Sequence, residues 1–180
     1  MTKAATLHQL DRLDQELSAL FSELECYDDT RLNHRPSDGG WTVLQVLHHL
    51  ILAETASLGY VRKKLSFNPI LDKAGAKAAW RLFVVDFYFR MPTKFKAPKG
   101  VDRSALPDES VFETTRKQWE AQRQELRHYL SHLPEERFDR ELYKHPFAGK
   151  MTLRQMLKFF GMHIKRHQKQ INRVLKEAAV

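Results

Sequence analysis

The sequence predicts an all-α fold, a four-helix bundle formed by one domain that spans residues 1–180. Four long segments carry apolar residues at spacings of three and four, the pattern of amphipathic helices. We find no convincing alternation of apolar and polar residues that would predict strands. A length of 180 residues, with 42% hydrophobic and 29% charged residues, is typical of one globular domain with a buried core.

The four predicted helices cover residues 6–26, 42–65, 110–133 and 152 to nearly the C-terminus. The first contains leucines at positions 7, 10, 13, 17, 20 and 24. The third ends before Pro134, which cannot continue a helix. Four amphipathic helices in one chain favour a bundle, because each apolar face must pack against another element.

A long connection, residues 66–109, separates the second helix from the third. We expect residues 73–90 to form a short helix and residues 91–107, which contain three prolines and a glycine, to form a loop that crosses the bundle. Loops of this length inside one domain are uncommon and often serve a function.

Two helices have the same start signal. A threonine stands three residues before a glutamine, which predicts a capping box, and apolar residues flank it as a hydrophobic staple. The pattern occurs at Thr42 and Gln45 with Trp41 and Val46, and at Thr152 and Gln155 with Met151 and Met156. We interpret Trp41 as part of this staple rather than as a platform for a substrate.

The net charge of +8 lies entirely in the second half of the chain, because residues 1–90 contain 11 basic and 11 acidic residues and residues 91–180 contain 19 and 11. In the fourth helix the basic residues share one face. Such a face can bind phosphates, but it is usually only solvated, and no DNA-binding motif accompanies it. We therefore do not favour nucleic acid as a partner.

His163 and His167 lie four residues apart on the apolar face of the fourth helix. Two imidazoles at this spacing can bind one metal ion, although a pair of hydrogen-bonded core histidines is an equally open interpretation. A zinc-protease motif is excluded because Ile164 stands where that motif has glutamate. His128 and His132 have the same spacing on a polar face, so we expect them to be solvated.

A third ligand is available on the second helix, from His48 or His49. Periodicity does not separate the two residues, but the small neighbours of His49 leave more room for a ligand. Cys26 stands alone near the end of the first helix, and we expect it to be structural or inert.

The chain contains no run of about 20 apolar residues and no apolar signal segment near its start, so we expect no membrane partner. A single cysteine excludes an internal disulfide and fits a cytoplasmic location.

Two motifs resemble those of the DinB/YfiT-like superfamily. The segment from Trp41 to Leu50, WTVLQVLHHL, is similar to the motif that opens the second helix of these proteins, with the ligand histidine at His49. The segment HIKRH is similar to the C-terminal H-x3-H of the family, and it follows a loop, HPFAGKMT, of the H-P-x-x-G-x-x-T type. The resemblance covers nearly the whole chain.

The resemblance implies an up-down-down-up topology with a long crossover between helices 2 and 3, and often a homodimer. It also implies a divalent metal, most often nickel or zinc, bound by His49, His163 and His167. Relatives include enzymes that activate a low-molecular-weight thiol, such as bacillithiol, for S-transfer to an electrophilic small molecule.

Alternatives remain open. Three neutral imidazoles leave a metal with open positions, at which either a thiol or a water can be deprotonated. A metal-dependent hydrolase is therefore the first alternative, and a non-catalytic or nucleic-acid-binding bundle is the second.

Overall fold

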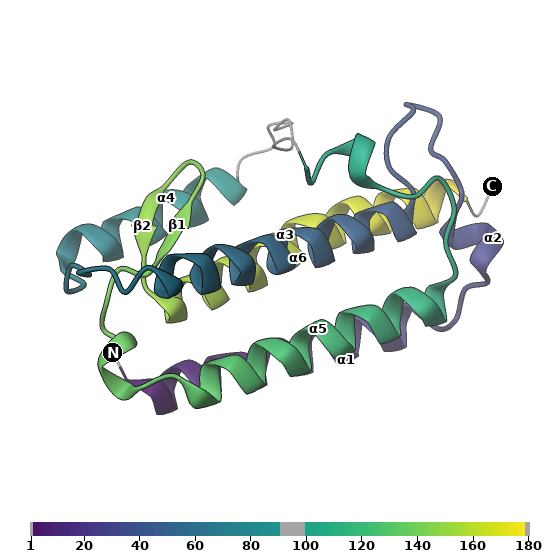
Figure 1. Ribbon diagram of the computed structural model, residues 1–180. Coiled ribbons are helices and arrows are strands. Elements are labelled where there is room, and N and C mark those ends of the chain that lie inside the picture. Colours follow the sequence, from purple (N-terminus) through teal and green to yellow (C-terminus); the bar gives the residue numbers. More distant parts are fainter. Residues whose placement is uncertain (1, 91–99, 179–180) are drawn as a thin grey trace.

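The computed structural model describes residues 2–90 and 100–178, without the side chains of residues 78, 79 and 88–90. Helices predominate in this part of the chain, which confirms the all-α class (Figure 1). None of them is both long and apolar enough to cross a membrane. The helices are α1 (Lys3–Leu24), α2 (Asp29–Leu32), α3 (Val43–Ser66), α4 (Ala76–Arg90), α5 (Phe112–His132) and α6 (Leu153–Glu177).

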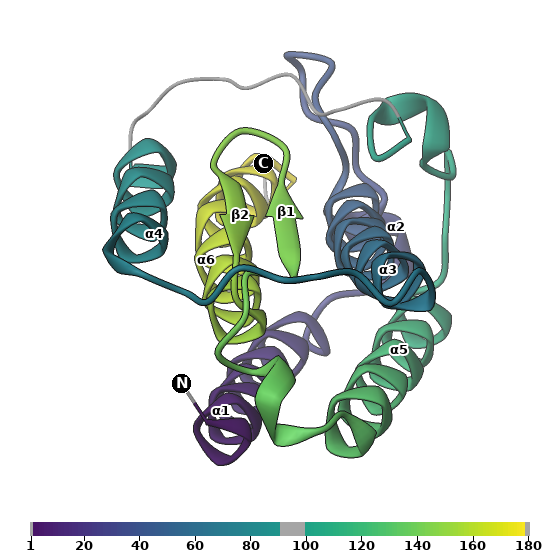
Figure 2. The same cartoon turned by 60° about the vertical axis from the view of Figure 1, so that its left-hand side comes forward.

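The four long helices pack in a closed ring of contacts. α1 contacts α5 and α6, and α3 contacts the same two helices (Figure 2). α1 and α6 run in one direction, and α3 and α5 run in the other (Figure 1). Buried leucines and aromatic residues fill the space between them in two clusters, one toward each end of the helices. Since α3 and α6 are neighbours, residues halfway along them can meet.

Local capping signals account for where three of the four long helices, α1, α3 and α6, begin. Both predicted capping boxes form, so α3 begins directly after Thr42 and α6 directly after Thr152. α1 begins earlier than predicted because the Thr2 side chain accepts a hydrogen bond from the Ala5 amide at 3.2 Å. These ends fix how far along each helix a given side chain lies.

The connection between α3 and α5 contains the expected short helix, α4. Val85 anchors it in the core with 4% of its surface exposed. Arg81 donates to both carboxylate oxygens of Glu141 at 3.1 Å and to the Lys150 carbonyl at 2.8 Å. Part of the predicted crossing loop, residues 91–99, lies outside the described residues, and the rest contains one 3₁₀ turn, Arg103–Ala105.

The absence of strands was predicted wrongly at one place, directly before α6. Strand β1 (Tyr143–His145) pairs antiparallel with β2 (Gly149–Met151). Strands of three residues are too short to show an alternating pattern in the sequence. The tight turn defines the hairpin instead: Gly149 has a positive φ of 81°, and His145 Nδ1 accepts hydrogen bonds from the amides of Phe147 and Ala148 at 3.3 and 3.2 Å.

Candidate metal site

Three histidine side chains from α3 and α6 converge. Nε2 of His163 lies 3.2 Å from Nε2 of His49 and 3.1 Å from Nε2 of His167. One ligand nitrogen from each residue lies within 4.8 Å of the other two. His49 is buried, and His163 and His167 are partly buried. We refer to these three residues as the histidine cluster.

The spacing in the histidine cluster fits a divalent transition metal. Nitrogen–metal bonds of about 2.0–2.1 Å place two ligand nitrogens about 3.3 Å apart in a tetrahedral site and about 2.9 Å apart in an octahedral site. The observed separations of 3.2 and 3.1 Å fall between these values. Two of the three separations therefore already match those of a metal site, and all three ligand nitrogens lie within 4.8 Å of one another.

Two of the three rings have an oxygen atom within hydrogen-bond distance of Nδ1, on the far side of the ring from Nε2. His49 Nδ1 lies 2.7 Å from the Val101 carbonyl oxygen, and His167 Nδ1 lies 3.0 Å from Oε1 of Gln170. Both oxygens can only accept, so in each neutral ring Nδ1 carries the proton. The lone pair of Nε2 is then directed at the other histidines, as metal binding requires.

The site keeps its histidines neutral. Burial, and after it the neighbouring His49, lower the pKa of His167 to about 3, although its hydrogen bond to Gln170 acts in the opposite direction. The pKa of His163 is well below its ordinary value, first because of burial and then because His167 and His49 lie beside it. Burial also lowers the pKa of His49, although its hydrogen bond to Val101 acts in the opposite direction. Neutral imidazole is the form that binds metals.

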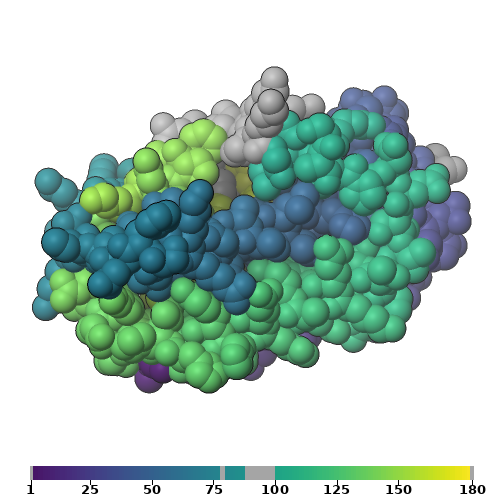
Figure 3. All heavy atoms as spheres, in the orientation of Figure 1, coloured from purple at the N-terminus to yellow at the C-terminus, as the bar shows by residue number. Residues whose placement is uncertain are grey.

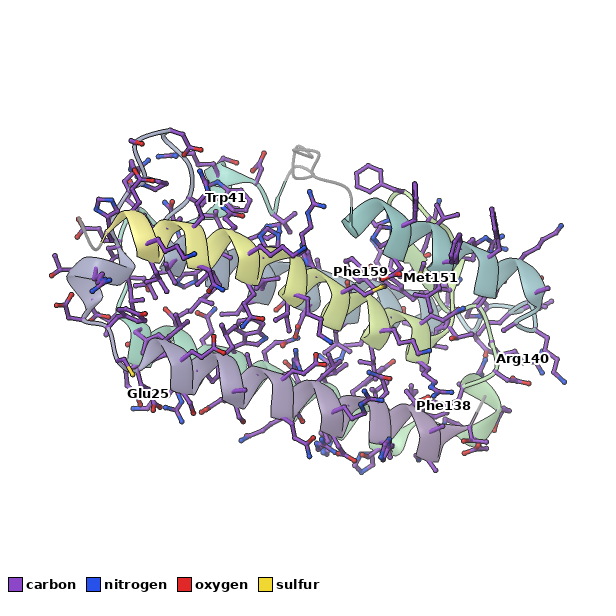
Figure 4. All side chains as sticks on the ribbon, turned by 180° about the vertical axis from the view of Figure 1, so that it is seen from behind. Glu25, Trp41, Phe138, Arg140, Met151 and Phe159 are labelled. Carbon is purple, nitrogen blue, oxygen red and sulfur yellow. The ribbon has the colours of Figure 1, made fainter. Side chains whose placement is uncertain are left out.

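Aromatic rings border the histidine cluster on two sides. The ring of Trp41 lies 4.8 Å from that of His49 and 6.3 Å from that of His167, nearly parallel to the latter. Phe159 stacks on His163 with ring centroids 5.3 Å apart. In Figure 4, Trp41, which precedes α3, and Phe159, which belongs to α6, lie apart along the length of α6. Trp41 also packs against the core cluster that contains Val46, as expected of a staple residue.

The structure separates His48 from His49, which periodicity in the sequence did not. His48 Nε2 lies 2.9 Å from Ser110 Oγ and 3.2 Å from Thr115 Oγ1, at the start of α5. His48 therefore links α3 to α5 and lies outside the histidine cluster.

The remaining candidates lie apart from the histidine cluster. His128 and His132 are exposed on α5, as expected, with ring centroids 4.2 Å apart. Cys26 is exposed just beyond the end of α1. The same spacing of two histidines thus has different surroundings in α5 and α6, because the faces of the two helices differ.

Sequence reasoning missed four residues around the histidine cluster. Helical spacing could have identified Phe159 and Gln170, because they lie four residues before His163 and three residues after His167 on the same helix. Trp41 was interpreted only as a staple. Val101 had no signal, since its carbonyl reaches His49 from a connection 52 residues away in sequence.

A recess opens on the face of the molecule shown in Figure 3. Its border includes α3, the β1–β2 hairpin and the segment that begins at residue 100, and atoms of α6 are visible within it (Figure 3). The two helices that carry the histidine cluster, α3 and α6, thus both reach this recess (Figure 3).

Comparison with known proteins gives the family. A sequence profile described as the DinB superfamily matches residues 9–171. The chain belongs to the DinB superfamily. A relative from Bacillus subtilis (strain 168), named "Uncharacterized protein YuaE", is 26% identical over 156 residues, which is 86% of this chain and 89% of the relative. No solved structure matches the chain. The three-histidine cluster of this DinB-superfamily protein is compatible with metal binding.

Proposed function

We propose that this protein is a divalent-metal-dependent enzyme in which His49, His163 and His167 bind one nickel or zinc ion. The observation that carries the proposal is the convergence of three neutral imidazoles, with Nε2 separations of 3.1 and 3.2 Å. Two histidines alone would fit a hydrogen-bonded core pair. Three rings directed at one point, two of them oriented by an outer acceptor, favour a metal centre.

The proposal includes the fold that the resemblance implies, a four-helix bundle with up-down-down-up topology and a long crossover. The ring of contacts among α1, α3, α5 and α6 supports it. In this arrangement α3 and α6 are adjacent, and the connection after α3 returns to the metal site, where the Val101 carbonyl contacts His49.

We infer that the activated group is a low-molecular-weight thiol, which is transferred to an electrophilic small molecule. A bound divalent ion would lower the pKa of a coordinated thiol. The sulfur would form a bond to the electrophilic carbon, the leaving group would depart with the bonding electrons, and the thiol proton would pass to solvent. The rings of Trp41 and Phe159 support this choice, because an apolar border suits a weakly hydrated sulfur better than water. A thiol co-substrate also fits a reducing compartment such as the cytoplasm.

Metal binding is the first test. Protein dialysed against a chelator and then titrated with Zn²⁺ or Ni²⁺ should bind one ion per chain by calorimetry. His49→Ala should reduce the affinity at least a hundredfold, because a strong ligand is lost. The double variant His128→Ala/His132→Ala is the matched control, and it should bind as the wild type does. If the control lost metal binding while His49→Ala kept it, the assignment of the metal site to the histidine cluster would be wrong.

Reaction is the second test. The loaded protein, mixed with bacillithiol, coenzyme A or cysteine and an electrophile such as monochlorobimane, should accelerate thiol consumption. The metal-free protein and His49→Ala should not. Turnover of an ester substrate without any thiol would instead favour hydrolysis. No metal-dependent turnover in either assay would contradict an enzymatic role.

A further inference from the structure

Gln170 is the side chain that contacts His167 on the far side of its ring. It lies three residues after His167 on α6, and its Oε1 is 3.0 Å from His167 Nδ1. His49 receives the corresponding contact from a backbone carbonyl, that of Val101. The acceptor at His167 is thus a side-chain group that can be changed without moving the backbone.

The contact with Gln170 bears on which nitrogen of His167 carries the proton. A neutral imidazole has one N–H and one lone pair, which can exchange places between Nδ1 and Nε2. With the proton on Nε2, His167 could donate to Nε2 of His163, which lies 3.1 Å away. That hydrogen bond would occupy both atoms that a metal needs. With the proton on Nδ1, the bond goes to Gln170, and Nε2 of His167 keeps its lone pair.

We propose that Gln170 is a positioning residue that holds His167 in its Nδ1–H tautomer, so that Nε2 is available to a divalent metal ion. The inference rests on the proposed function, because it assigns Gln170 to the same site. Its role is indirect, since it acts through His167. Groups that accept a hydrogen bond from a ligating histidine typically change metal affinity by about 10–100-fold.

Three variants separate positioning from general effects on the helix. Gln170→Leu removes the acceptor and keeps a residue of similar length that favours helix. Gln170→Glu keeps an oxygen acceptor and should therefore keep the proton of His167 on Nδ1. Gln168→Leu is the matched control: two residues away on α6, its Nε2 donates to Glu23 Oε2 at 3.1 Å, at the surface and away from the histidine cluster.

The metal-free proteins are compared first, by ¹⁵N NMR of the histidine side chains at pH 7.5. The wild type, Gln168→Leu and Gln170→Glu should show His167 protonated on Nδ1. Gln170→Leu should shift the proton substantially toward Nε2. An unchanged tautomer in Gln170→Leu would overturn the inference, even if its metal affinity were reduced.

Zinc affinity is then measured by competition with a chelator, for variants whose thermal unfolding by circular dichroism matches the wild type. We expect Gln170→Leu to bind about 10–100-fold more weakly, Gln168→Leu within about threefold of the wild type, and Gln170→Glu at least as tightly as the wild type. Equal affinity in Gln170→Leu and Gln168→Leu would overturn the inference. A wild type that binds no metal would contradict the proposed function, whereas the tautomer measurement would still decide whether Gln170 orients His167.

Discussion

Neighbouring residues on one helix can have unrelated roles, as His48 and His49 on α3 do. The two side chains differ by about 100° around the helix axis. That rotation directs His49 toward α6 and directs His48 toward Ser110 and Thr115 near α5. At this scale the identity of the contacting element determines the role of each histidine.

The first prediction concerns this pair. His48→Ala should lower the free energy of unfolding by about 1 kcal/mol, because one side-chain hydrogen-bond partner is lost. Ser110 and Thr115 would keep their mutual hydrogen bond of 2.9 Å. Zinc affinity, measured by calorimetry, should stay within about threefold of the wild type, unlike that of His49→Ala. Metal binding lost in His48→Ala but kept in His49→Ala would show that the ligand position is off by one residue.

The second prediction concerns pH and His145. This residue is 4% exposed, and burial lowers its pKa from 6.5 to about 4. The unfolded chain therefore binds a proton at His145 below pH 6.5, whereas the folded protein does so only below about pH 4. Stability from this group is complete above pH 6.5 and declines as the pH falls through that window, by about 3 kcal/mol in total.

The measurement is urea unfolding of metal-free protein between pH 7.5 and 4.5. His145→Asn cannot titrate, yet its side-chain oxygen can accept the amides of Phe147 and Ala148, so its stability should depend less on pH than that of the wild type. His128→Asn changes an exposed histidine and serves as the control. An identical pH dependence in His145→Asn and the wild type would contradict the prediction.

At the scale of elements, a buried ion pair joins α5 to α3. Arg123 donates from Nε and Nη2 to the two carboxylate oxygens of Glu54 at 2.6 and 2.7 Å, and Trp119 donates to the same carboxylate at 3.2 Å. Arg123 also donates to Asp14 on α1 at 3.0 Å. The side chains of Arg123 and Glu54 are only 4% and 2% exposed. One guanidinium therefore connects three of the four long helices.

The third prediction tests this pair by urea unfolding. Arg123→Met should cost about 3–5 kcal/mol, because Glu54 would remain charged and buried without its partner. Adding Glu54→Leu should recover much of that loss, since both charges are then removed. Lys117→Met, in an exposed pair with Glu113 at 3.2 Å, should cost less than about 1 kcal/mol. Additive losses in the double variant would show that the two charges do not interact.

At the scale of the whole molecule, α4 exposes an apolar face. Trp80, Phe83 and Phe87 follow one another at spacings of three and four and are 65%, 59% and 55% exposed. The rings of Trp80 and Phe83 stack at 5.5 Å. Because Val85 and Arg81 hold the opposite side of the helix against the protein, this face is directed outward. Exposed apolar patches of this kind are often covered by a partner.

The fourth prediction is that the homodimer implied by the family resemblance forms through this face. Light scattering after gel filtration should give twice the chain mass of 21.2 kDa. Phe83→Ser/Phe87→Ser should give the mass of one chain, because the apolar contact is lost. Phe147→Ser, at another exposed aromatic residue (76%), is the control and should remain dimeric. A wild-type monomer, or a double variant that stays dimeric, would contradict this interface.

The sequence by itself determined where α3 and α6 begin and which faces the long helices bury. Helix caps and apolar periodicity act between residues three or four apart, so the Thr42 and Thr152 capping boxes and the solvated pair at His128 and His132 could be predicted locally. The histidine pair of α6 was placed on the correct face for the same reason. Room on one side of a helix, together with the family motif, was enough to select His49 but did not show what His48 contacts.

Tertiary structure alone decided the surroundings of the histidine cluster. The Val101 carbonyl reaches His49 because a connection folds back over α3, and no local pattern encodes that return. The same holds for the β1–β2 hairpin, whose short strands depend on one turn and on packing against α3 and α6. The position of Phe159 over His163 could be anticipated from their spacing, but Trp41 reaches His167 only because α3 and α6 pack side by side. Contacts between elements depend on how the helices pack, which is a property of the assembled core and not of any single segment.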